Sequence, residues 1–97
     1  MGSLKIVVLK RALHAIEKTT EWYQINLNLT AANHFKEGIY HTIEVLSRMP
    51  SIGRKDESIK GNHTYYSFLA HPKYRIVYRY TDSTLYIVAI RATMMSC

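Results

Sequence analysis

The chain has 97 residues, with 13 lysines and arginines against 7 aspartates and glutamates, and a net charge of +6 at pH 7. This length predicts one domain, residues 1–97, with a small core and a thin stability margin. The hydrophobic content of 47% excludes wholesale disorder. The positive charge favours anionic partners, either nucleic acid or an acidic protein, although many small basic domains carry such charge without a functional role.

The chain's compartment is predicted from its one cysteine, Cys97, which allows no intrachain disulfide and fits a reducing environment. No apolar run approaches the roughly 20 residues that a membrane-spanning helix needs. The run between Lys5 and Lys10 is too short for the hydrophobic region of a signal peptide. We therefore expect a cytoplasmic protein that does not enter a membrane.

A short apolar run, Leu4–Leu9, opens the chain and is typical of a strand buried on both faces. From Leu9 onward the apolar residues recur at steps of three and four, as on one side of an amphipathic helix. The segment Asn26–Leu29 breaks this pattern, so we expect the helix to end there. The expected buried stripe consists of Leu9, Leu13, Ile16, Thr20, Tyr23 and Leu27.

A second helical pattern follows Thr30, which we expect to be its N-cap, and stops before Pro50. Gly38 lies inside this helix at a cost of about 1 kcal/mol relative to alanine, which predicts close packing at that position. About four residues join the two helices, so they must lie antiparallel as a hairpin. The expected stripe of the second helix is Ala32, Phe35, Ile39, Thr42, Ile43, Leu46 and Met49.

Residues 50–63 contain two glycines, mixed charges and no hydrophobic period, which indicates a loop. Beyond it, Tyr65–Thr93 is rich in β-branched and aromatic residues and predicts three consecutive strands. The reversals are expected at Ala70–Lys73 and Thr81–Thr84, because proline, aspartate and serine suit turns. The loop delivers three cations just ahead of these strands: Arg54, Lys55 and Lys60.

The two reversals set an expected register for the three strands. Centring each turn on its middle two residues places Leu69 opposite Tyr74 and Val77 opposite Val88. Alternation along the middle strand then separates two sets of side chains. One set is Arg75, Val77 and Arg79, and the other is Tyr74, Ile76, Tyr78 and Tyr80. Two arginines beside a valine do not suit a dry face, so that face must meet water or an anion.

The predicted element order is β-α-α-β-β-β in the α+β class. We expect an antiparallel helical hairpin packed on one face of a mainly antiparallel four-stranded sheet. The first strand must pair at an edge of the meander, and the edge beside the last strand is the expected position.

The five histidines do not form a metal site by spacing. His34 and His41 are two turns apart on one helix, roughly 10 Å by helical rise, too far for one zinc without a ligand between them. We expect surface histidines, no metal and no cofactor. A Cys97 nucleophile is discarded because chain termini are usually poorly ordered.

A basic and aromatic set of residues remains. Arginines on the strands and tyrosines around them could hold a phosphodiester backbone and stack bases. Metal-free RNA cleavage also needs a proton acceptor, a proton donor and stabilisation of the phosphorane charge. Arg75 could stabilise that charge, but the acid and base have no clear candidate. The alternative for the tyrosines is core and cross-strand packing, which we favour.

Three stretches together resemble the RelE/ParE superfamily of type II toxin–antitoxin toxins. They are Met49–Arg54, Tyr74–Arg79 and Leu85–Arg91, and the resemblance extends over nearly the whole chain, including Trp22 late in the first helix. The family's β-α-α-β-β-β fold agrees with the order predicted above. The resemblance implies a toxin, associated with plasmid stabilization, that a cognate antitoxin neutralises with an acidic, amphipathic segment.

The two branches of this family act differently. RelE-like members are ribosome-dependent mRNA endoribonucleases, and ParE-like members poison DNA gyrase. By resemblance, Arg75 matches the strand arginine that the nucleases place at the scissile phosphate. The nucleases also carry a tyrosine or histidine near the C-terminus, and here neither follows Tyr86. The helical hairpin and the turn Pro50–Arg54 look more like ParE.

The resemblance therefore implies a ParE-like growth inhibitor, with DNA gyrase as its target, as the first hypothesis. A RelE-like mRNA endoribonuclease acting on the ribosome is the alternative, with Arg75 as its catalytic residue. A decayed toxin that retains only antitoxin binding is the third. The expected nucleic-acid or target-binding residues are Arg54, Lys55, Lys60, Arg79 and Arg91.

Overall fold

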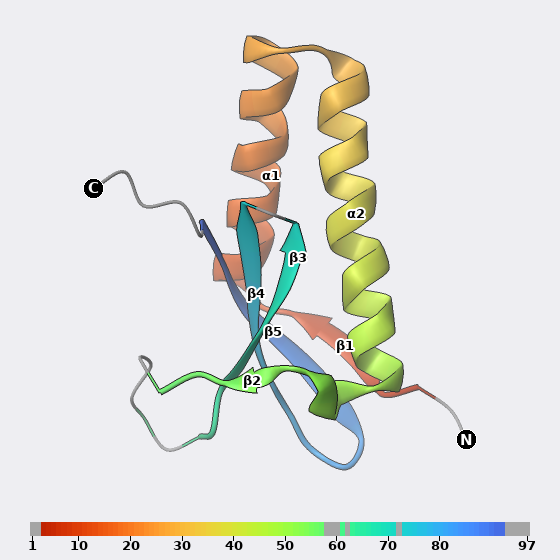
Figure 1. The fold of residues 1–97 in the computed structure, drawn as a ribbon, viewed down its shortest axis with the longest axis vertical. Helices are drawn as coiled ribbons and strands as arrows, with labels where there is room; N and C mark the ends of the chain where they lie inside the picture. Colours follow the sequence, from red (N-terminus) through yellow and green to blue (C-terminus); the bar gives the residue numbers. More distant parts are fainter. Residues whose placement is uncertain (1–2, 58–60, 62, 72, 93–97) are drawn as a thin grey trace.

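The computed structural model describes residues 3–57, 61, 63–71 and 73–92. Two helices form a hairpin that packs on one face of a sheet, so the α+β class is confirmed (Figure 1). The elements in chain order are β1 (Lys5–Val8), α1 (Lys10–Asn26), α2 (Leu29–Arg48), the 3-10 helix η1 (Pro50–Ile52), β2 (Arg54–Lys55), β3 (Tyr66–His71), β4 (Tyr74–Tyr80) and β5 (Thr84–Ala92).

The sheet has five strands in the order β1-β5-β4-β3-β2. β1 runs parallel to β5, which confirms the predicted position of the first strand, and the other three pairings are antiparallel. The expected count of four strands was wrong by one. The additional strand, β2, lies in the segment predicted as a loop.

A buried tyrosine hydroxyl explains β2. The Tyr78 hydroxyl donates to the Pro50 carbonyl oxygen at 2.6 Å and accepts from the Gly53 N–H at 3.0 Å. These two bonds hold the turn at η1 against the sheet, so the next two residues run alongside β3. A hydrogen bond across 25 residues has no local sequence signal, and a two-residue strand has no period of its own.

The two helices are joined by Leu27 and Asn28 alone, a tighter connection than expected. The N-cap of α2 is Asn28, whose side-chain oxygen accepts from the Ala31 N–H at 2.7 Å. The predicted cap, Thr30, lies inside the first turn. Asn and Thr both suit an N-cap, and the position closest to the end of α1 is the one used.

The helical stripes were predicted well for α2 and less well for α1. On α2 the predicted positions Ala32, Phe35, Ile39, Ile43 and Leu46 are buried, and Met49 is exposed. On α1 the buried positions are Ala12 and Ile16, whereas the predicted Leu13 and Leu27 are exposed.

The prediction of close packing at Gly38 was wrong. Gly38 is exposed, and a Cβ atom added there would meet nothing within 4 Å. This glycine therefore lies on the solvent side of α2, where no neighbour requires its small size.

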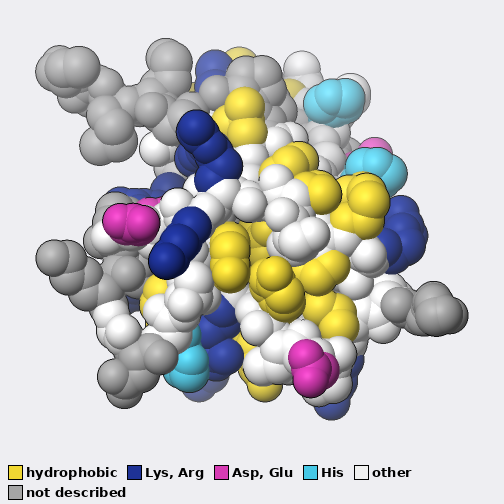
Figure 2. Space-filling model, turned by 60° about the horizontal axis from the view of Figure 1, so that its bottom comes forward, with side chains coloured by type: hydrophobic (Ala, Val, Ile, Leu, Met, Phe, Trp, Pro, Cys, Tyr) yellow, Lys and Arg dark blue, Asp and Glu magenta, His cyan; other side chains and the backbone are white. Residues whose placement is uncertain are grey.

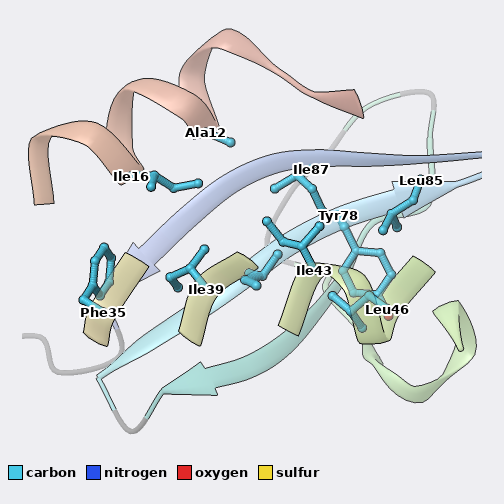
Figure 3. Close-up of a cluster of buried hydrophobic side chains, with 10 residues drawn as sticks. Ala12, Ile16, Phe35, Ile39, Ile43, Leu46, Tyr78, Leu85 and Ile87 are labelled. Carbon is cyan, nitrogen blue, oxygen red and sulfur yellow. The ribbon is translucent and has the colours of Figure 1, made fainter. Parts of the chain in front are cut away.

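The core lies between the hairpin and the sheet (Figure 3). Its centre is aliphatic, and Tyr78 enters it from the sheet with no exposed surface. Around it the rings of Tyr66, Tyr78 and Tyr80 pack together, with centroids 5.3–6.2 Å apart. These contacts confirm cross-strand packing for these tyrosines. The buried cluster is Ala12, Ile16, Phe35, Ile39, Ile43, Leu46, Ile76, Tyr78, Leu85 and Ile87.

The register of the meander differs from the prediction by one residue. Near the second turn it is as expected, with Tyr80 opposite Leu85. Farther along, Val77 lies opposite Ala89 instead of Val88, because the pairing shifts between Val77 and Tyr78. This irregularity keeps side chains at positions 87 and 90 on the core side of the sheet.

The first turn is also irregular. Leu69 lies opposite Arg75, not Tyr74, and the pairing shifts between Leu69 and His71. A turn with such a shift cannot be placed from the identity of its turn-forming residues alone.

Candidate functional site

The face of the sheet that points away from the helices carries four arginines, and we call it the basic face. Because directly opposed residues on neighbouring strands point to the same side, the register places Arg75 and Arg91 beside each other, and Arg79 beside Tyr86. Arg54 on β2 lies opposite Ser67 and shares this side. The basic face is defined by Arg54, Arg75, Arg79, Arg91 and Tyr86.

The predicted division of β4 is confirmed. Tyr74, Ile76, Tyr78 and Tyr80 join the core or pack against it, which leaves the arginines on the other side. Between those arginines the floor of the basic face is formed by small side chains. Val77 is fully buried and Ser67 is 6% exposed, although both described helices lie on the other side of the sheet (Figure 1).

The charges of the basic face are held in different ways. The Arg79 guanidinium carbon lies 4.0 Å from the centroid of the Tyr86 ring, a cation–π contact. An Arg91 nitrogen lies 4.0 Å from a carboxylate oxygen of Asp56. Among the described residues, no carboxylate oxygen lies within 4.0 Å of the Arg75 guanidinium. Arg75 thus offers a positive charge that no carboxylate neutralises there.

A purely structural role for Arg75 would need an acidic partner, such as Glu44 or Asp56. Glu44 instead lies 3.9 Å from Arg48, one turn along α2, and Asp56 lies beside Arg91. Both Glu44 and Arg48 are more than half exposed, so that pair contributes little to stability.

One predicted binding residue, Lys55, does not lie on the basic face. Lys55 lies opposite Tyr66, which packs against the core, so its register position is on the helix side of the sheet edge. Lys60, another predicted binding residue, lies outside the described residues. Of the predicted set, the described residues on the basic face are therefore all arginines.

His63, considered above only as a possible metal ligand, lies near the basic face. His63 helps to line a hollow of about 420 Å³ beside the end of β4, together with Arg79, Tyr66 and Tyr80. Its ring also meets that of Tyr65 edge to face, at a centroid distance of 6.2 Å. His63 and Arg79 line the same hollow only because of the path that the chain takes after β2. The spacing of the two residues in the sequence therefore could not predict that they lie near each other.

The tyrosines on the core side are poor proton acceptors. Burial raises the pKa of Tyr78 to about 12. Burial, with a smaller contribution from the neighbouring Tyr23 hydroxyl 3.5 Å away, raises the pKa of Tyr74 to about 12. Burial and the nearby Tyr66 raise the pKa of Tyr80 as well. At neutral pH these three phenols are therefore protonated and cannot accept a proton as a base.

Two further properties concern the described residues as a whole. They contain no group of three histidine, cysteine, aspartate or glutamate side chains arranged to hold a metal ion. None of their helices is both long enough and apolar enough to cross a membrane.

The fold and the basic face together define a small α+β protein in which the described helices cover one face of the sheet and arginines lie on the other. The sequence profile of the ParE toxin of type II toxin–antitoxin systems, parDE, matches residues 6–96. The chain belongs to this family, and the predicted resemblance is confirmed. It is therefore a toxin of the type II toxin–antitoxin class, and the family implies a cognate antitoxin partner.

Solved structures show the same fold. A chain of the chromosomal ParDE system from P. aeruginosa is similar at a TM-score of 0.79 and 14% identity, covering 95% of this chain and 98% of that one. A chain of a YoeB dimer from Staphylococcus aureus is similar at a TM-score of 0.59 and 21% identity, and the match covers 93% of this chain and 97% of that one. A YoeB/ParE toxin from Agrobacterium tumefaciens is similar at a TM-score of 0.59 and 23% identity, and the match covers 94% of this chain and 100% of that one. A comparison with curated proteins finds no match.

Proposed function

We propose that this toxin acts as a ParE-like growth inhibitor in the cytoplasm, with DNA gyrase as its target and without catalysing a reaction. The observation that carries the proposal is the chemistry of the basic face. Its described residues are arginines and Tyr86, whose ring Arg79 stacks on. The carboxylate beside them, that of Asp56, is paired with Arg91. Metal-free RNA cleavage needs a proton acceptor and a proton donor as well as charge stabilisation. Arginines supply only the last of these.

The same face suits an inhibitor that binds by charge. Arg75 has no carboxylate within 4.0 Å in the described chain, so its interaction with an anionic group on the target is not weakened by an internal partner. Arg54 and Arg91 add further positive charge on the same side. In such an interface Arg75 is one contact among several.

Induced expression in a bacterium tests this proposal, with and without the small gene that neighbours the toxin gene. We expect growth arrest that the neighbour relieves, induction of the DNA-damage response, and intact mRNA. The Arg75→Ala variant should weaken the toxicity without ending it. Cleaved mRNA at arrest would refute the proposal. Normal growth on expression, with antitoxin binding retained, would favour a decayed toxin.

The antitoxin contact provides a separate test. We propose that an acidic, amphipathic segment of the antitoxin binds positive charges of this chain, including Arg54, Lys55 and Arg91. Part of the interface energy is then lost in ordering that segment and recovered from apolar contacts. The dissociation constant should rise with salt concentration. An affinity that does not change with salt would remove these residues from the interface.

A RelE-like ribonuclease is the second candidate, and the hollow beside Arg79 favours it because that hollow contains His63. A histidine could exchange a proton where Arg79 or Arg75 stabilises a phosphorane. Removal of one preorganised donor to a developing oxyanion costs on the order of 10²–10³ in rate. Arg75→Ala and His63→Ala would then each abolish mRNA cleavage on the ribosome, whereas under the first proposal His63→Ala leaves growth inhibition unchanged.

A further inference from the structure

The far end of the helical hairpin extends past the sheet (Figure 1). Four large apolar side chains are exposed there, and we call them the hairpin-end patch: Trp22 at 54%, Ile25 at 73%, Leu27 at 59% and Leu29 at 58%. Ile25 is three residues after Trp22 on α1, and the two leucines flank Asn28 at the connection. Connections between helices are normally polar because they face water, so this concentration of apolar surface indicates an interface.

The charge around the patch differs from that of the rest of the molecule. No charged residue occurs between Glu21 and Lys36. Over residues 17–37 there are two lysines and three glutamates, a net charge of 2 − 3 = −1. The rest of the chain therefore carries 11 basic and 4 acidic residues, a net charge of +7. The hairpin end is separated from the charge that would attract nucleic acid, an acidic antitoxin or an anionic lipid surface.

We propose that the hairpin-end patch is the surface on which a second copy of this chain docks. Two copies that each carry a charge of +6 repel one another wherever their basic surfaces meet. The hairpin end is nearly neutral and apolar, so two copies can meet there without that repulsion. The same surface on both partners gives a two-fold symmetric contact, the commonest form of homodimer.

The shape of the hairpin end supports a self-complementary contact. A hollow of about 430 Å³ is lined by Trp22 and Tyr74, with Lys18 and Thr19 at its side. A second hollow, about 410 Å³, is lined by Tyr23 and Phe35 among others. A two-fold interface needs both projecting and receiving features within one patch. The exposed Ile25 and Leu27 supply the projecting side chains, and these aromatic-lined hollows supply the receiving surface.

The contact is independent of the proposed target, because the basic face lies on the sheet and not on the outer end of the hairpin. Dimerisation through the hairpin ends leaves both basic faces open. Each dimer could then bind two antitoxin segments or two sites on a target.

The test uses the whole chain and its single tryptophan, Trp22, which lies in the patch. Sedimentation equilibrium over a range of protein concentrations measures the monomer–dimer constant, and Trp22 fluorescence is followed over the same range. We expect a dimer, with tryptophan emission that moves to shorter wavelength as the dimer forms. Because the patch carries no charge, added salt should not weaken the dimer.

The variant Ile25→Lys should raise the dissociation constant of the dimer at least about tenfold, because it places a charge inside an apolar contact. Ile25 is 73% exposed, so the far-UV circular dichroism and the melting temperature of the monomer should not change. Leu27→Lys provides a second variant of the same kind.

The matched control is Met49→Lys. Met49 is 51% exposed at the opposite end of the hairpin, near Ile52 at 39%. Figure 2 brings this lower end of the molecule forward and shows a second gathering of hydrophobic side chains, with lysine and arginine side chains around it. The control should leave the dimer intact. If Met49→Lys dissociates the dimer and Ile25→Lys does not, the dimer interface lies at the end of the hairpin near Met49, and the proposal fails.

Two other results would overturn the proposal. One is a chain that remains monomeric at every concentration, with fully exposed tryptophan emission. The other is a blue shift on vesicles of phosphatidylcholine, alone or with phosphatidylserine, by a chain that does not self-associate. That result would assign the patch to a lipid surface instead. We expect no shift on either vesicle.

Discussion

The two faces of β4 differ in what their side chains contact. On the helix side, three tyrosines and an isoleucine contribute to the core or pack against it. On the basic face, two arginines surround a single buried valine. The helix side removes apolar surface from water and holds most of the stability, whereas the basic face holds charge that water or a partner must solvate. Folding and binding are therefore separated across the thickness of one strand, and substitutions on the two sides should have different consequences.

The largest effect is expected on the helix side. Leu46 is fully buried and belongs to the stripe by which α2 packs on the sheet. Leu46→Ala should lower the free energy of unfolding by about 2–5 kcal/mol, through lost burial and the cavity that remains. Chemical denaturation measures this change. A loss below about 1 kcal/mol would show that the contact between helix and sheet is not a main source of stability.

A smaller loss is expected at Gly53→Ala. A Cβ atom at this position would collide with the Tyr78 hydroxyl, which holds the η1 turn to the sheet. Overpacking of this kind costs about 1–3 kcal/mol. Tyr78→Phe removes the hydroxyl and its two hydrogen bonds, so adding it to Gly53→Ala should recover part of the cost. Strictly additive losses in the double variant would contradict a direct collision.

Alkaline pH should weaken the helix side without a substitution. The pKa of Tyr78 and the pKa of Tyr74 are raised to about 12 in the fold, above the value of about 10 in an unfolded chain. The protonated phenol is thus favoured by folding. This contribution is complete below pH 10 and is lost as the pH rises towards 12. Melting temperatures should fall over that interval, and Tyr78→Phe should reduce the slope. A flat profile would mean that both phenols ionise freely.

The smallest effect on stability is expected on the basic face. Arg75→Ala should change the free energy of unfolding by less than about 1 kcal/mol, because Arg75 has no internal carboxylate partner within 4.0 Å among the described residues. The adjacent Ile76 is fully buried, so Ile76→Ala should cost about 2–5 kcal/mol. Thermal melts of this neighbouring pair compare the two faces directly. Equal losses would remove the distinction between them.

The basic site was predicted from the sequence only in part. The alternation of β4 placed Arg75 and Arg79 on one face, and the structure has them there, because a period of two is a local property of any strand. His63 beside Arg79 and Asp56 beside Arg91 could not be predicted. Both placements depend on how the segment after β2 returns to the sheet, and its sequence has no period that would fix that path.

For the fold, the sequence by itself determined the two helices, the three long strands and the position of β1 beside β5. These follow from hydrophobic periods and from the short connections that restrict how neighbouring elements can meet. Only the tertiary structure decided the fifth strand, the N-cap at Asn28 and the one-residue shift that places Val77 opposite Ala89. Each of these depends on a contact between distant segments or on a choice between equivalent local signals. The fifth strand is the clearest case, because the hydroxyl of the buried Tyr78 forms its hydrogen bonds with Pro50 and Gly53, which lie far from it in the sequence.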